Sequence, residues 1–380
     1  MWYRMPRKRR RTVLKGIGTL GIAGLVAGCG GGGDGGGGDG SDGSDGSDGD
    51  GSDGSDGSDG TDGEDVNVGM VYAAGGLGDG SFNDQAKQGI LQAEEEFGVS
   101  FQESQPESVS DFGPAQQQYA QSGEFDLVCC IGFLQKDPLS STAADFPEQN
   151  FMIVDEVVET DNVASYVFRE HEGSFLVGHL AGALTSMEFS AGAGSTASDS
   201  TNVGFVGGVE SELIKRFEAG FTAGVKNASE DVDVITSYVG DFSDPAGGQE
   251  QALSMYNSGA DIVYHAAGNT GRGVFQAAQE QGRFAIGVDR DQSVTAPDFA
   301  DVILASMIKR VDTAVYTSVE SVVSGEFQGG TTTALGLERE GVGIGYGEQL
   351  GSEIPQDLKD AISSARQGII DGDISVPTSP

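Results

Sequence analysis

The sequence contains little of what disulfide frameworks, metal centres and nucleic-acid binding require. Its 380 residues include three cysteines, three histidines and 21 Lys and Arg against 59 Asp and Glu. Three cysteines cannot build a disulfide framework, and the histidines lack the spacing of a metal site. Beyond residue 28 the chain has only 14 basic residues. Nucleic acid is therefore excluded as a partner, because phosphate binding needs clustered cations.

The acid excess indicates the solvent in which the chain works. The formal net charge is −38, although residues 1–28 carry seven basic residues and no acid. A surface this acidic repels itself in dilute salt and is tolerated where the Debye length falls to about 3 Å, near 1 M salt. We therefore expect a halophilic protein. Disorder is disfavoured for residues 66–380, where apolar segments recur.

The first residues predict export and lipid anchoring. Residues 4–15 are strongly basic and precede a short apolar run, which is typical of a signal peptide over residues 1–28. Arg10 and Arg11, followed by Thr-Val-Leu-Lys, resemble a twin-arginine signal. Leu-Val-Ala-Gly-Cys then resembles a lipobox in which Cys29 is lipidated. A retained transmembrane anchor is the alternative.

The segment 29–65 predicts a tether. After Cys29, every residue up to position 65 is Gly, Ser, Thr, Asp or Glu. No such side chain enters a core, and the like charges repel, so we expect an expanded coil. The folded part would then be held at the outer face of the cytoplasmic membrane.

From residue 66, short apolar runs alternate with amphipathic segments. Strands are expected at 66–72, 125–131, 151–154, 164–168, 202–208, 232–239, 261–265 and 284–288, and helices at 84–97, 214–226, 245–257 and 273–281. This alternation predicts an α/β fold with parallel sheets covered on both faces. Cys129 and Cys130 are adjacent within one strand, so their thiols should point to opposite faces.

Two series of such elements imply two lobes and a ligand cleft at the carboxyl ends of their strands. The Ala/Ser/Gly-rich stretch Ser190–Ser200 is expected to be a loop beside the hinge. Residues 302–307 are interpreted as a strand that returns to the first lobe. The expected division is an N-terminal lobe of 66–190 and 302–325, a C-terminal lobe of 198–301 and 326–365, and a tail of 366–380.

An enzyme is disfavoured. No serine or cysteine lies in a nucleophile-elbow pattern. The sequence Gly268–Gly273 follows a strand but has the order GxxGxG instead of the GxGxxG of a dinucleotide loop. We expect a tight turn that presents backbone N–H groups to the cleft, and no cofactor.

Seven motifs occur in one order: GDGSFND at 78–84, GFLQKD at 132–137, REHEGSFLVGHLAG at 169–182, VGFVGG at 203–208, RFEAGFTAG at 216–224, GVDRDQ at 287–292 and SMIKR at 306–310. Together with the lipobox, they resemble the basic membrane protein (BMP) lipoproteins, the solute-binding components of ABC importers that include purine-nucleoside receptors. The resemblance covers about residues 66–355.

The resemblance implies a type I periplasmic-binding-protein fold, with two Rossmann-like lobes and a three-crossing hinge. A nucleoside-like solute would bind in the cleft and pass to an ABC permease and ATPase. The expected ligand-binding residues are Phe82, Asn83, Asp137, Phe217, Gly268, Asp289 and Lys309. Phe82 and Phe217 would stack on a base, while Asp137 and Asp289 would accept hydrogen bonds from ribose hydroxyls.

Several alternatives stay open. A phenylalanine in a strand-to-helix loop, such as Phe82, is more often a core cap than a ligand platform, and Lys309 is also a candidate for a solvated helix charge. Tyr72-Ala73 stands where nucleoside receptors commonly have Thr-Asp, so the ligand could be a different small molecule. A ligand-sensing receptor of the same fold is the alternative function.

Overall fold

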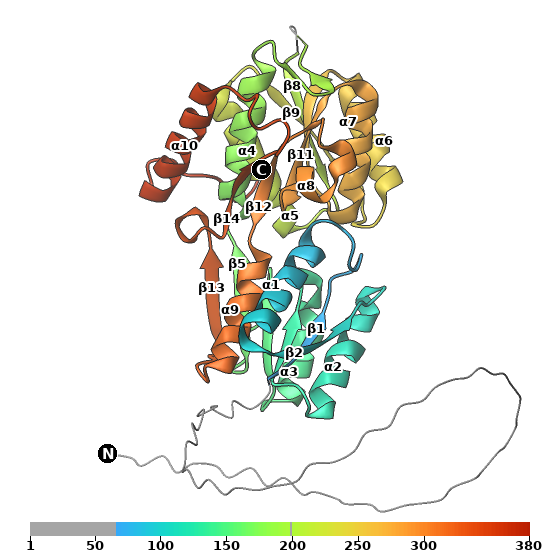
Figure 1. Ribbon diagram of the computed structural model, residues 1–380, viewed down its shortest axis with the longest axis vertical. Helices are drawn as coiled ribbons and strands as arrows, with labels where there is room; N and C mark the ends of the chain where they lie inside the picture. The colour runs from blue at the N-terminus through green and yellow to red at the C-terminus, as the bar shows by residue number, and fades with distance from the viewer. Residues whose placement is uncertain (1–65, 198–199) are drawn as a thin grey trace, which may run out of the picture. The chain divides into compact units, whose positions relative to one another are not determined.

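The computed structural model describes residues 66–197 and 200–380. The predictions for the signal peptide, Cys29 and the tether lie outside the described residues. Among the helices that are described, none has the length and apolar character needed to cross a membrane. Residues 66–380 form two α/β lobes, each built on a six-stranded sheet (Figure 1). The α/β fold with two parallel sheets is thus confirmed.

The first lobe has a fully parallel sheet in the order β13-β5-β4-β3-β1-β2. Its strands are β1 Asn67–Val71, β2 Ser100–Ser104, β3 Leu127–Cys130, β4 Asn150–Val154, β5 Val163–Phe168 and β13 Thr331–Leu335. One face carries α1 Phe82–Phe97 and α9 Val311–Val323, and the other carries α2 Phe112–Ser122 and α3 Lys136–Asp145. Cys129 and Cys130 are buried on opposite faces, as predicted.

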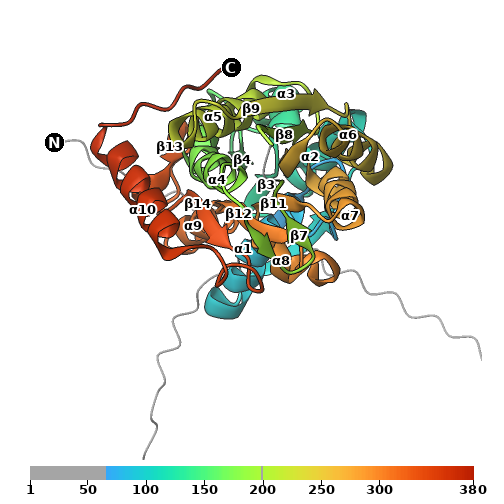
Figure 2. The same ribbon diagram turned by 90° about the horizontal axis from the view of Figure 1, so that it is seen from above.

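The second lobe repeats this order as β14-β12-β11-β10-β8-β9, with β14 antiparallel. Its strands are β8 Asn202–Gly207, β9 Asp233–Tyr238, β10 Ala260–Ala266, β11 Phe284–Asp289, β12 Ile303–Lys309 and β14 Val342–Tyr346. The helices α4 Glu170–Thr185 and α5 Glu212–Ala228 cover one face, and α6 Pro245–Asn257 and α7 Gly271–Gln281 the other (Figure 2). A last helix, α10 Gln356–Asp371, packs on α4.

The chain passes between the lobes three times, as the fold prediction required. The crossings are Arg169, between β5 and α4; Arg310, between β12 and α9; and residues 336–341, between β13 and β14. Backbone hydrogen bonds join them: Arg169 N–H donates to Leu335 O at 3.0 Å, and Arg310 N–H donates to Gly341 O at 2.9 Å. The hinge is therefore one hydrogen-bonded strip.

The predicted division of the lobes is wrong at α4, β12 and β13, and the predicted tail of 366–380 begins inside α10. Helix α4 belongs to the second lobe, so the first boundary lies at residue 169 instead of 190. Strand β12 pairs with β11 of the second sheet and does not return to the first lobe. Strand β13, assigned to the C-terminal lobe, pairs with β5. Helix α9, within 302–325, does pack on α1 of the first lobe.

Close packing between α4 and α5 explains the first of these corrections. A Cβ added to Gly178 would lie 2.2 Å from the carbonyl oxygen of Phe221, and one added to Gly224 would lie 2.0 Å from that of Phe175. Only glycine permits backbones to approach this closely. The apolar face of α4 is therefore buried against α5 and the second sheet.

The Ala/Ser/Gly-rich stretch that begins at Ser190 does not lie beside the hinge, contrary to the prediction. Its residues include a small hairpin of β6 Ser190–Ala191 and β7 Gly194–Ser195. Ala193 N–H donates to Asp301 O, and Ser195 N–H donates to Gly282 O. Because residues 282 and 301 precede β11 and β12, this hairpin lies at the amino-terminal edge of the second sheet, opposite the cleft.

Candidate functional site

A cavity lies between the lobes at the carboxyl ends of strands from both sheets. The space between its lining atoms is about 750 Å³, which includes the part that is open to solvent. Its walls are mostly apolar, with polar groups contributed by Asp79, Asn83, Asp155, Asp289 and Lys309. Gly268, two residues beyond the end of β10, also lines the cavity.

The N-terminus of α1 forms one wall. Asp79 is 4% exposed, and its carboxylate accepts hydrogen bonds from the backbone N–H groups of Ser81, Asn83 and Asp84 at 2.9–3.2 Å. This capping starts the helix at Phe82, two residues before the predicted start, and places the Phe82 ring on the cavity.

Asn83 lines the cavity, but its side chain serves mainly to hold the loop before α1. Its Oδ1 accepts from Ala73 N–H at 2.9 Å, and its Nδ2 donates to Gly76 O at 3.0 Å. Asn83 is therefore a positioning residue for the cavity wall, which the sequence could not reveal.

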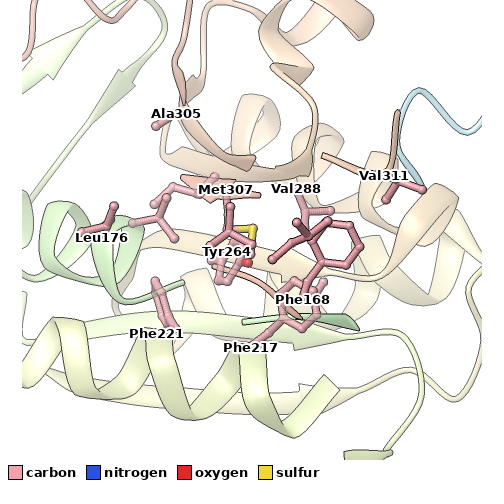
Figure 3. Packing of buried hydrophobic residues seen from close by; sticks show 14 of the residues in the cluster. Phe168, Leu176, Phe217, Phe221, Tyr264, Val288, Ala305, Met307 and Val311 are labelled. Carbon is pink, nitrogen blue, oxygen red and sulfur yellow. The ribbon is translucent and has the colours of Figure 1, made fainter. Parts of the chain in front are cut away.

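A second phenylalanine faces the cavity from the other lobe. Phe217 projects from α5, is 3% exposed, and lies beside Phe168 at the end of β5 (Figure 3). Phe221, one turn further along α5, packs instead against Phe205 and Tyr264 in the core. The predicted pair of Phe82 and Phe217 is thus brought to one cavity from opposite lobes.

Lys309 is a buried cation at the centre of the site and is not a solvated helix charge. It ends β12, is 1% exposed, and places its Nζ 5.1–5.4 Å from the ring centroids of Phe82, Phe168 and Phe217. The ammonium lies 2.7 Å from Asp155 and 3.3 Å from Glu170. Burial lowers the pKa of Lys309, but these carboxylates outweigh it and raise the pKa above its usual value.

Two aspartates occupy equivalent positions in the two lobes. Asp155 directly follows β4, and Asp289 ends β11; each of these is the third strand in the order given for its sheet. Both have a left-handed backbone, with φ of 73° and 66°, and both line the cavity. Such a conformation is uncommon for a residue other than glycine and turns each side chain towards the cleft. The sequence predicted Asp289 but missed Asp155.

Asp289 is poised to titrate near neutral pH. Burial raises its pKa to about 7, against the opposing effects of Lys309 and of a hydrogen bond from Ser81 Oγ at 2.5 Å. Asp79 and Asp155 raise the pKa further, because they place negative charge nearby. The carboxyl group can therefore lose its proton when a ligand donates a hydrogen bond to it, because such a bond favours the ionised form.

Asp137 does not lie at the cleft, where the sequence predicted it. This residue lies in the first turn of α3, is exposed, and is not among the residues that line the cavity. The turn of Phe133–Gln135 intervenes between β3 and α3, so Asp137 comes too late to reach the strand edge. Phe133, in that turn, lines the cavity instead.

Contacts across the mouth bring the lobes together. The rings of Phe133 and Phe242 meet edge to face, with centroids 6.4 Å apart. Thr295 Oγ1 donates to Gly80 O at 2.8 Å, and the Ser81–Asp289 hydrogen bond also joins the lobes. The lobes are therefore closed on one another around the cavity.

Two lobes, a three-crossing hinge and a cleft between them define the periplasmic-binding-protein fold, in which the lobes close on a small ligand. The profile of the Bmp family, described as "ABC transporter substrate-binding protein PnrA-like", matches residues 66–379, and the chain belongs to this family. It is accordingly a substrate-binding component of a transporter and not an enzyme.

Similar proteins agree with this family. The chain is 37% identical to a CD4+ T-cell-stimulating antigen of Listeria monocytogenes, over 83% of this chain and 89% of that protein. It is 34% identical to the ABC transporter nucleoside-binding protein BmpA of Lactococcus lactis, over 83% and 90%. A crystal structure of a solute-binding protein from Aeropyrum pernix matches with a TM-score of 0.74 at 31% identity, over 82% and 93%.

Proposed function

We propose that this protein captures a nucleoside in the cleft and delivers it to the permease and ATPase of an ABC importer. The observation that carries the proposal is the pairing of Phe82 and Phe217 from opposite lobes beside Asp155, Asp289 and Lys309. The likeness to a nucleoside-binding relative supports it.

The aromatic and the acidic groups of the cavity suit the two parts of a nucleoside. A flat base between two phenyl rings gains about 0.5–1.5 kcal/mol per ring pair beyond the area it buries. Ribose hydroxyls would donate to Asp155 and Asp289, and hydrogen bonds to charged groups contribute about 1.5–3 kcal/mol each. In this proposal Asp155, close to Lys309, takes the role that the sequence had given to Asp137.

The site of action follows from the N-terminal sequence. A signal peptide over residues 1–28, a lipid on Cys29 and a tether to residue 65 would hold the lobes at the outer face of the cytoplasmic membrane. Mass spectrometry of the mature N-terminus from the native host tests this: we expect a lipidated Cys29, whereas an intact Met1 would contradict it.

Ligand binding is tested by thermal unfolding of the purified full-length protein with purine and pyrimidine nucleosides in multimolar salt. Because a ligand at a hundredfold excess over its Kd stabilises by about 2.7 kcal/mol, a nucleoside that binds should raise the midpoint by several degrees. Failure of every nucleoside to raise the midpoint would overturn the proposal.

Phe217→Leu and Phe221→Leu form a matched pair of variants. Each removes one buried ring from α5, but only Phe217 lines the cavity. Both should lower the midpoint of the free protein, while only Phe217→Leu should reduce the ligand-induced rise. Equal rises in the two variants would remove Phe217 from the site.

A further inference from the structure

The cavity has an unbalanced set of charges. Three acidic side chains line it, those of Asp79, Asp155 and Asp289, and burial raises the pKa of Asp289 to about 7, so it is only partly charged at neutral pH. Among the described residues of the lining, Lys309 is the one with a basic side chain. All four are at most 5% exposed. A ligand that carried its own negative charge would meet these carboxylates with little solvent between them, where charge repulsion is strong.

Lys309 is not free to offset such a charge. Both carboxylate oxygens of Asp155 lie 2.7 Å from its Nζ, and Glu170 Oε1 lies at 3.3 Å. One ammonium thus already faces two carboxylates. An incoming anion would have to displace Asp155, leaving that buried carboxylate without its partner, which is costly.

The remaining place for an anion is already filled. The N-terminus of a helix binds phosphate through its free N–H groups, and α1 begins at the cavity wall. Its N–H groups at Ser81, Asn83 and Asp84 donate to the Asp79 carboxylate. Asp79 therefore stands where a ligand phosphate would otherwise bind, and it adds a charge that repels one.

We infer that Asp79 acts as a charge filter that excludes phosphorylated ligands, so that the protein takes up only the dephosphorylated solute. This inference rests on the proposed nucleoside function and names the form of the solute that the site accepts. It makes Asp79 a specificity-determining residue, which the sequence reading did not select.

The inference also places the protein in a sequence of reactions. Outside the membrane, a phosphomonoester must first be hydrolysed: water adds at phosphorus, the bond to the 5′ oxygen breaks, and inorganic phosphate and the 5′-hydroxyl are released. Capture and import follow that hydrolysis.

The first test uses the unaltered full-length protein and isothermal titration calorimetry. Adenosine, adenosine 5′-monophosphate and an adenosine bearing a neutral 5′-carboxamide are compared, with inosine and guanosine forms as further probes. We expect the monophosphate, with its charge of about −1.5 to −2, to bind at least 100-fold more weakly than the nucleoside, and the neutral derivative to lose less than 10-fold. Equal rejection of both 5′ derivatives would show exclusion by size and overturn the charge filter.

Salt separates the buried filter from the acidic surface. Repulsion by exposed charges is largely screened near 1 M salt, whereas buried charges are screened far less. The 100-fold discrimination should therefore persist between 0.5 M and 3 M salt. Its disappearance at high salt would assign it to the surface and overturn the role of Asp79.

Two variants complete the test. Asp79→Asn should reduce the ratio of the affinity for the nucleoside to the affinity for its monophosphate at least 10-fold. Glu95→Gln removes an exposed acid from α1 that does not line the cavity, and should leave the ratio unchanged. An unchanged ratio in a folded Asp79→Asn protein contradicts the inference. If that variant does not fold, the 5′ series and the salt series decide. If adenosine, inosine and guanosine all fail to bind, the proposed function fails instead.

Discussion

At the scale of single residues, the site depends on charges buried together. Lys309, Asp155 and Glu170 are each at most 4% exposed and lie within ion-pair distance. Two of them belong to different lobes, because Asp155 follows β4 and Lys309 ends β12. Their mutual attraction holds the two lobes together beside the hinge.

Lys309→Met should lower the free energy of unfolding by about 3–5 kcal/mol, since removing one partner of a buried pair leaves the other charge uncompensated. Without the cation, the pKa of Glu170, which burial already raises, rises further. A carboxyl group whose pKa is raised in the folded state destabilises the protein increasingly as pH rises. The loss of stability caused by Lys309→Met should therefore be smallest in acid. Guanidinium unfolding at several pH values measures this.

Lys136→Met is the control for that measurement. This substitution removes the lysine of the solvent-exposed ion pair between Lys136 and Glu156. Such a pair is expected to contribute about 0–1 kcal/mol to the free energy of unfolding. Comparable losses in the two variants, or a loss for Lys309→Met that grows in acid, would contradict the account of the buried cluster.

The resemblance to the BMP lipoproteins pointed to several of the residues that the structure brings to the cavity. Phe82 in a glycine-rich loop, Phe217 and Asp289 were selected, and each lines the cavity. Asp155 was missed because nothing in the letters Val-Asp-Glu reports a positive φ, which appears only once the chain is folded. Asp137 was selected in error because the turn before α3 is not evident from its composition.

At the scale of elements, the packing of α4 on α5 determines the boundary between the lobes. Glycines on each helix lie against the backbone of the other. The alternation of strands and helices was predicted correctly, and α6 has its predicted bounds of Pro245–Asn257. The lobe to which α4 belongs was predicted wrongly. The Ala/Ser/Gly-rich stretch after α4 resembles a linker between lobes, and the long-range contacts that decide where a helix packs are not visible in the sequence.

Gly224→Ala should destabilise the protein by about 1–3 kcal/mol, the usual cost of overpacking. The added Cβ would lie 2.0 Å from Phe175 O and 2.8 Å from His179 N, so the helices would have to separate. Chemical unfolding provides the measurement. Gly113→Ala is the control, because its Cβ would make an ordinary 3.5 Å contact with Pro138 and alanine favours a helix. Equal effects of the two substitutions would argue against close packing as the cause.

At the scale of the whole molecule, closure of the lobes should govern how long a ligand stays. Phe133 and Phe242 meet across the mouth of the cavity. Such a pair contributes about 0.5–1.5 kcal/mol, so Phe133→Leu and Phe242→Leu should each raise the dissociation rate about 2–10-fold. Stopped-flow displacement of a bound nucleoside measures this rate, and most such effects appear in dissociation.

A double-mutant cycle distinguishes contact between the lobes from contact with the ligand. If the two rings act on each other, the double variant should raise the dissociation rate by less than the product of the single effects. Strict multiplicativity would show that they do not. Phe97→Leu, which alters the Phe97–Tyr316 pair inside the first lobe, should leave the rate unchanged.

The strip formed by the three crossings has a mechanical consequence. Because its segments are hydrogen-bonded side by side, we expect them to bend together about one line and the two lobes to move as rigid bodies. Movement is least beside that line and grows with distance from it. A membrane partner that contacts both lobes far from the hinge would therefore distinguish the ligand-bound from the ligand-free protein by the distance between its two contact sites. It would not need to touch the ligand.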